Sequence, residues 1–253
     1  MSTPPPPFGF HSNAWPFEPQ DMMNRMPAEL RPQARGVLFW MVSWPLIILG
    51  STVIASLLAD LLAGGSTENM IRAYYVMIVV TYLGVLWLFA RWLKPQGLAG
   101  AVLDFRPERP GLESGYAFVL LILSLIFSLT AVYIFQNLAP APLPMMRPPV
   151  PGQDPLSIWY LVPAIVILAP YIEEVVMRGW ILPALVVRMG GWILPIVISA
   201  AFFGLLHFFA GWPSVVYTTV LGICAGIARR VTGRMWAPIT LHMANNALAV
   251  SNL

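Results

Sequence analysis

Two adjacent carboxylates lie inside one of the most apolar stretches of the chain. Glu173 and Glu174 follow the segment IVILAPYI (165–172), and Arg178 comes about one helical turn later. A charged side chain at the centre of a bilayer costs about 2.5 to 3.5 kcal/mol even by the low estimates. Ionisable residues in such a position indicate a functional site, and the rest of the chain must supply its partners.

Helical spacing predicts different roles for the two carboxylates. Glu174 and Arg178 are four residues apart, so their side chains share a helix face and can form an ion pair. Glu173 is rotated by about 100° from Glu174 and points elsewhere. A carboxylate removed from water is an effective general base. We therefore expect Glu173 to take a proton from water.

Further polar residues lie on the apolar segments that follow. His207 follows Phe203 by four residues, so an aromatic ring should pack beside the imidazole, and His242 and Asn246 are also four apart. We expect His207 to hold the water with Glu173. His242 and Asn246 are expected to donate hydrogen bonds to the oxyanion of a tetrahedral intermediate. Two histidines and a carboxylate can alternatively hold zinc with one open position.

Each of these features also has a purely structural interpretation. The Glu174–Arg178 pair can serve only to pack helices, and His207 or Phe203 in an apolar helix can be an ordinary core residue. The polar residues of 242–246, Asn245 included, can link helices at about 0.6 kcal/mol per hydrogen bond. Their occurrence together, in a chain with few other buried polar groups, favours a hydrolytic site. The sequence contains no His-Glu-x-x-His motif of a zinc protease.

Composition places this site in a membrane. Hydrophobic residues make up 58% of the chain and charged residues 10%, against about 25% charged in soluble domains. Apolar runs near the 20 residues that a spanning helix needs predict an all-α, polytopic bundle of about seven spans with an intramembrane active-site cavity. The first three spans carry no strongly polar group and are expected to be scaffold. The predicted spans are 36–60, 71–92, 114–137, 158–187, 192–211, 213–229 and 235–251.

Charge distribution predicts the orientation. Eleven Lys and Arg residues lie in loops on one side and only Arg72 and Arg147 on the other, which places the N-terminus in the cytoplasm. The basic residues are scattered singly, a pattern that fits membrane topology rather than nucleic-acid binding. Residues 1–35 are Pro-rich without an apolar run and are expected to form a disordered cytoplasmic tail. Cys224 is the single cysteine, so no disulfide framework exists.

Three motifs together resemble a known family. EEVVMRG (173–179), FGLLH (203–207) and HMANN (242–246) are similar to the motifs Glu-Glu-x-x-x-Arg, Phe-x-x-x-His and His-x-x-x-Asn of the CPBP family. This family of intramembrane proteases includes the type II CAAX prenyl endopeptidases, the bacteriocin-processing enzymes and the Abi-like proteins. The motifs are complete and in order within 155–253, and we expect 36–253 to form one transmembrane protease domain.

The resemblance implies an endopeptidase that cleaves a membrane-associated peptide or protein. By position, Glu173 matches the water-activating base and His207, His242 and Asn246 its catalytic partners. The supporting residues are Glu174, Arg178 and Phe203. Both metal-dependent and glutamate-only mechanisms have been assigned to the family, so a divalent metal such as zinc stays open. The expected location is a bacterial inner membrane.

Two other functions remain as alternatives. The chain can be a non-catalytic membrane adaptor whose polar cluster only fixes helix packing. It can also be a proton-coupled transporter with Glu173 as carrier, although no inverted repeat is visible between its halves.

Helix lengths raise one conflict. Counted from opposite faces at 1.5 Å per residue, Glu173 lies about 24 Å along the fourth span and His207 about 22 Å along the fifth. The two meet only if 157–163 lies outside the hydrocarbon or the fifth span begins in a cavity. We expect the former, with the site near mid-membrane and displaced toward the cytoplasm.

Overall fold

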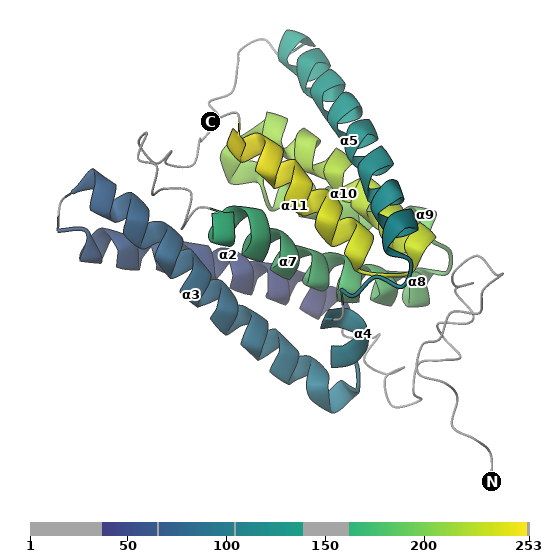
Figure 1. Ribbon diagram of the computed structural model, residues 1–253, viewed down its shortest axis with the longest axis horizontal. Coiled ribbons are helices and arrows are strands. Elements are labelled where there is room, and N and C mark those ends of the chain that lie inside the picture. The colour runs from purple at the N-terminus through teal and green to yellow at the C-terminus, as the bar shows by residue number, and fades with distance from the viewer. Residues whose placement is uncertain (1–36, 65, 104, 139–161, 252–253) are drawn as a thin grey trace.

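The protein is described by a computed structural model that covers residues 37–64, 66–103, 105–138 and 162–251 (Figure 1). Within these ranges the chain is helical and contains no strand, as the sequence predicts. The predicted tail (1–35) lies outside the described residues, and so do the first residues of the fourth predicted span (158–161).

The first two helices form an antiparallel hairpin. Helix α2 (Val37–Leu62) packs along α3 (Thr67–Leu93), at the lower left of Figure 1. The Ser66 hydroxyl accepts a hydrogen bond from the Asn69 N–H and caps α3. Large apolar side chains such as Leu57 and Leu61 are exposed on the outer side of α2, as lipid contact requires.

A second layer is built from helices farther along the chain. The short helix α4 (Ala99–Leu103) leads to α5 (Pro110–Leu138), which packs on α10 (Trp212–Thr232) and α11 (Trp236–Ser251). The Glu113 carboxylate accepts the N–H groups of Glu108 and Arg109, both at 2.8 Å, at the start of α5. Helix α10 ends at Gly233, whose φ of 66° needs a residue without Cβ.

A central helical rod carries the paired carboxylates. Its consecutive parts are the π-helical segment η4 (Val162–Leu168), α7 (Ala169–Glu174), the π-helical segment η5 (Val175–Ile181) and α8 (Leu182–Met189).

Proline explains the π-helical turns of the rod. Each π segment ends two residues before a proline, Pro170 or Pro183, whose ring would clash with the carbonyl four residues earlier. A wider turn relieves that clash, and the Leu182 N–H accordingly donates to the carbonyl of Met177, five residues back. The segments follow one another without a break, and π turns of this kind often mark functional sites.

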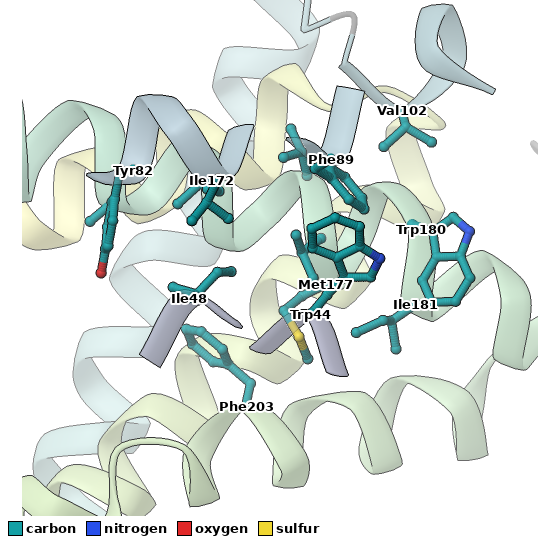
Figure 2. Close-up of a cluster of buried hydrophobic side chains, with 14 of the residues drawn as sticks. Trp44, Ile48, Tyr82, Phe89, Val102, Ile172, Met177, Trp180, Ile181 and Phe203 are labelled. Atoms are coloured by element: carbon teal, nitrogen blue, oxygen red, sulfur yellow. The ribbon is translucent and has the colours of Figure 1, made fainter. Parts of the chain in front are cut away.

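The rod lies between the two layers. It contacts α2 and α3 on one side and α10 and α11 on the other, and Figure 1 shows α7 between α3 and α11. Figure 2 shows the first contact: Trp44 and Ile48 of α2 and Phe89 of α3 pack with Met177 and Ile181 of the rod. A side chain at Gly179 would lie 2.9 Å from Val102, so glycine is needed where α4 crosses the rod.

Helix α9 is shorter than predicted. It runs over Ile193–Leu205 and is followed by a turn and the 3₁₀ helix η6 (Phe208–Ala210), whereas the sequence predicts a span through 211. In the described ranges, four helices (α2, α3, α5 and α10) are long and apolar enough to cross a membrane. These helices confirm an all-α membrane bundle, and the protein is an integral membrane protein. The count of seven spans stays a prediction.

Contacts at one end of the bundle join two loops that the charge pattern places on the same side of the membrane. Arg234, between α10 and α11, forms an ion pair with Glu108 before α5, with 2.7 Å between Nη2 and Oε2. The Trp236 indole N–H donates to the Ser114 hydroxyl at 3.0 Å. Both loops therefore lie at the same end of the protein.

Candidate active site

The predicted ion pair is present and fully buried. Arg178 Nη1 donates to Glu174 Oε1 at 3.0 Å, and both side chains have no exposed surface. Arg178 also donates from Nη2 to the carbonyl of Gly222 on α10, at 2.9 Å. Its guanidinium carbon lies 4.8 Å from the centroid of the Phe203 ring. The buried charge thus has a carboxylate, a carbonyl and an aromatic face as partners.

Gly222 makes room for this guanidinium, and its replacement by alanine is expected to destabilise the protein. A Cβ there would lie 2.9 Å from Arg178 Nη2 and 3.1 Å from Ala200 on α9. Overpacking of this kind costs about 1 to 3 kcal/mol. Reversible unfolding in mixed micelles measures the loss. The control is Gly84→Ala on α3, where a Cβ would meet nothing within 4 Å. Equal stability of the two variants would contradict the tight contact.

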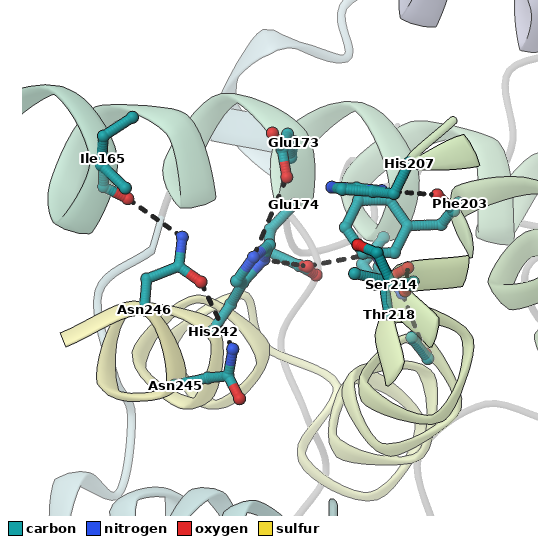
Figure 3. A network of polar contacts seen from close by, with 12 residues as sticks. Ile165, Glu173, Glu174, Phe203, His207, Ser214, Thr218, His242, Asn245 and Asn246 are labelled. Carbon is teal, nitrogen blue, oxygen red and sulfur yellow. Dashed lines mark hydrogen bonds and ion pairs between the residues drawn. The ribbon is translucent and has the colours of Figure 1, made fainter. Parts of the chain in front are cut away.

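His242 connects the two carboxylates. Its Nδ1 lies 2.9 Å from Glu174 Oε1 (Figure 3). A carboxylate paired with a guanidinium is ionised and can only accept, so His242 carries its proton on Nδ1 and donates it to Glu174. The other ring nitrogen, Nε2, lies 3.8 Å from Glu173 Oε2. A neutral His242 with its proton on Nδ1 has no N–H left for an oxyanion, contrary to the expectation from its position on the helix. Spacing along one helix predicts only the contact of Glu174 with Arg178. It does not predict the contact with His242, because the two residues are 68 positions apart in the sequence.

His207 has the same arrangement of ring nitrogens. It lies in the turn after α9, and its Nδ1 donates to the Phe203 carbonyl at 2.9 Å. A neutral His207 is therefore left with Nε2 as an acceptor. The Phe203 ring meets His207 and His242 edge-on, with centroids 4.9 and 5.7 Å away, which confirms the predicted contact between Phe203 and the imidazole.

Glu173 and His207 line one cavity of about 170 Å³. Residues 45–52 of α2 supply one wall and Tyr82 of α3 another, and both lie near the middle of their helices. Two of the three spans expected to be scaffold, α2 and α3, thus also line this cavity. The remaining lining residues are Pro45, Ile48, Leu49, Thr52, Val176, Met177, Phe203 and Leu206.

The structure brings Glu173 and His207 to one cavity. Helix α9 ends at Leu205, and His207, in the turn that follows, lines this cavity together with residues of α2. The depth of the site in the membrane stays a prediction. The expected placement of 157–163 outside the hydrocarbon falls mostly on residues outside the described ranges and stays a prediction.

The two asparagines of α11 are coupled. Asn246 Nδ2 donates to the carbonyl of Ile165 in η4 at 3.0 Å (Figure 3). Asn246 Oδ1 accepts from Asn245 Nδ2 at 3.3 Å, and Asn245 Oδ1 accepts from the Tyr217 hydroxyl at 2.6 Å. Asn245 therefore links Tyr217 of α10 to Asn246. Asn246 ties α11 to the rod and keeps its second N–H as a donor.

The donor types for zinc are present, but their arrangement is not that of a metal centre. In the described ranges, no group of three or more His, Cys, Asp or Glu side chains is close enough to hold a metal ion.

Comparison with known proteins agrees with the three motifs. Residues 155–248 match the model of the family described as type II CAAX prenyl endopeptidase Rce1-like. This match confirms the predicted resemblance over the segment that carries Glu173, His207, His242 and Asn246, and it supports a membrane protease. No curated protein and no solved structure matches the chain.

Proposed function

We propose that the protein is an intramembrane endopeptidase that hydrolyses a peptide bond of a membrane-associated peptide or protein by glutamate-activated water. One observation carries this proposal: Glu173 lines a cavity with His207, while the adjacent Glu174 is committed to Arg178 and His242. One carboxylate is thereby left for chemistry, and its neighbour organises the site.

The reaction starts with a water molecule between Glu173 and the histidine Nε2 acceptors. Glu173 takes a proton from this water, and the oxygen attacks the carbonyl carbon of the substrate. The C=O bond becomes a C–O⁻ single bond in a tetrahedral intermediate. When the C–N bond breaks, the electron pair goes to nitrogen, and Glu173 returns its proton to the leaving amine.

Glu174 supports this chemistry through His242. The Nδ1–H bond to Glu174 fixes the imidazole orientation and directs Nε2 toward Glu173. If Nε2 takes up a proton during turnover, the ionised Glu174 stabilises the imidazolium, as a buried carboxylate does in a catalytic triad. The guanidinium of Arg178 balances the negative charge of Glu174.

We place the N-terminus in the cytoplasm and the protein in a bacterial inner membrane. The positive-inside pattern supports this orientation, and the Arg234–Glu108 pair is consistent with it because both residues lie on the predicted cytoplasmic side.

The direct test is cleavage of a peptide library by purified protein in lipid nanodiscs, read by mass spectrometry. Wild-type protein should cleave, and Glu173→Gln should not. A folded wild type that cleaves nothing would favour the non-catalytic adaptor. Elemental analysis of the active protein then separates metal-dependent from metal-free hydrolysis.

Asn246 is proposed to use its second N–H at the oxyanion, and α11 offers a graded test. Asn246→Ala should lower kcat by about 100 to 1,000-fold with little change in KM. Asn245→Ala should have a smaller effect, since Asn246 keeps its bond to Ile165. Tyr217→Phe, which removes only the outer hydrogen bond, should have the smallest effect.

The same variants can also contradict the role of Asn246 at the oxyanion. His242→Ala and His242→Ala/Asn246→Ala should be similarly inactive, because the loss of His242 beside Glu173 already stops the activation of water, and effects of groups that act in one reaction are not additive. If Asn245→Ala is as damaging as Asn246→Ala while His242 is dispensable, α11 only links helices.

A further inference from the structure

Two residues of the α2–α3 hairpin that carry hydroxyl groups line the cavity, and the proposed mechanism does not use them. Besides Glu173 and His207, the polar residues among those described on its wall are Thr52 of α2 and Tyr82 of α3. Tyr82 is only 6% exposed and belongs to the same buried cluster as Ile48 (Figure 2). A buried tyrosine hydroxyl needs a polar partner.

The Thr52 hydroxyl can accept the Tyr82 proton. Thr52 donates to the carbonyl of Ile48 at 3.1 Å, and the Thr52 and Tyr82 oxygens are 3.2 Å apart, a contact in which either oxygen can be the donor. When Thr52 gives its one hydrogen to the backbone, Tyr82 donates to Thr52.

The size of the cavity brings this donor within reach of the reaction. A sphere of its volume is about 7 Å across, which is space for about five water molecules or one peptide group with a small side chain. The water activated by Glu173 attacks the carbonyl carbon of a peptide bound in this space. The carbonyl oxygen then lies near the walls that the other helices supply. Tyr82 comes from α3, a different helix from the one that carries Glu173.

We propose that Tyr82 is a further catalytic residue, whose hydroxyl turns from Thr52 to the carbonyl oxygen of the scissile peptide and stabilises the oxyanion formed there. This inference rests on the proposed endopeptidase function. No proton is transferred from Tyr82: its O–H donates a hydrogen bond that strengthens as negative charge develops on the oxygen. Thr52 serves as the resting acceptor and keeps the hydroxyl satisfied before substrate enters.

A matched pair of variants separates this role from a structural link between α2 and α3. Tyr82→Phe and Thr52→Val both remove the interhelical hydrogen bond with little change in volume. Only Tyr82→Phe removes the donor to the oxyanion. It should lower kcat by about 100-fold with KM nearly constant. Thr52→Val should retain a kcat at least about tenfold above that of Tyr82→Phe.

Binding of a peptide phosphinate, which resembles the tetrahedral intermediate, gives a second measurement. Tyr82→Phe should weaken phosphinate binding by about the same factor as kcat, since both report the transition state. Equal falls in kcat for the two variants, or a Tyr82→Phe enzyme with wild-type kcat and phosphinate affinity, would overturn the role of Tyr82. Those outcomes leave the proposed function standing if the wild type cleaves. A folded wild type without activity overturns both proposals.

Discussion

Replacement of Glu173 by glutamine is expected to abolish peptide cleavage while leaving stability nearly unchanged. Glutamine has the same shape as glutamate but cannot accept a proton from water. The Glu173 side chain is 20% exposed and lies on the cavity wall, so the amide can be accommodated there. Loss of a general base lowers rates by about 100 to 10,000-fold. Because this variant also loses the means to form the attacking hydroxide, we expect a fall in kcat near the upper end of that range.

The measurement compares kcat on a cleaved peptide with the midpoint of reversible unfolding in mixed micelles. His207→Gln is the companion variant, because it removes the imidazole that lines the cavity together with Glu173. It should also reduce kcat strongly. A Glu173→Gln enzyme with wild-type turnover would falsify the proposed base and shift attention to Glu174. A large loss of stability in this variant would indicate a packing role for Glu173.

Much of the fold follows from local properties of the sequence. Apolar runs of about 20 residues require helices in lipid, because only internal hydrogen bonds satisfy the backbone there. The extents of α2, α3 and α5 accordingly agree closely with the predicted spans. The end of α9 at Leu205 was not predictable in this way, because the segment 206–211 is as apolar as a helix interior.

In the candidate site, contacts within one helix were predictable from the sequence and contacts between helices were not. Pairs four residues apart, such as Glu174 with Arg178, were predictable from the geometry of a single helix. Contacts between helices were not. Three of them build the site: Glu174 with His242, Asn246 with the carbonyl of Ile165, and Tyr82 with Thr52. They depend on how the rod packs between the hairpin and α11, and hydrophobicity leaves that packing undetermined.

Glu174→Gln is expected to be the most destabilising of the polar substitutions. The change leaves the guanidinium of Arg178 buried without its carboxylate, and the loss of one partner from a buried pair costs about 3 to 5 kcal/mol. Glu173→Gln is the matched control, since it makes the same chemical change at the adjacent position. Equal stability losses for the two variants would contradict the division of roles between the carboxylates.

A double-mutant cycle with Arg178→Met shows how Glu174 acts. Arg178→Met should cost less than Glu174→Gln, because His242 can take up a proton and pair with the remaining carboxylate. The double variant Glu174→Gln/Arg178→Met should regain most of the lost stability, since no buried charge is left unpaired. Its kcat should stay low, because His242 has lost the carboxylate that accepts from Nδ1 and directs Nε2 toward Glu173. If the double variant recovers activity along with stability, Glu174 serves only to neutralise Arg178, and the link from Glu174 through His242 to Glu173 has no part in catalysis.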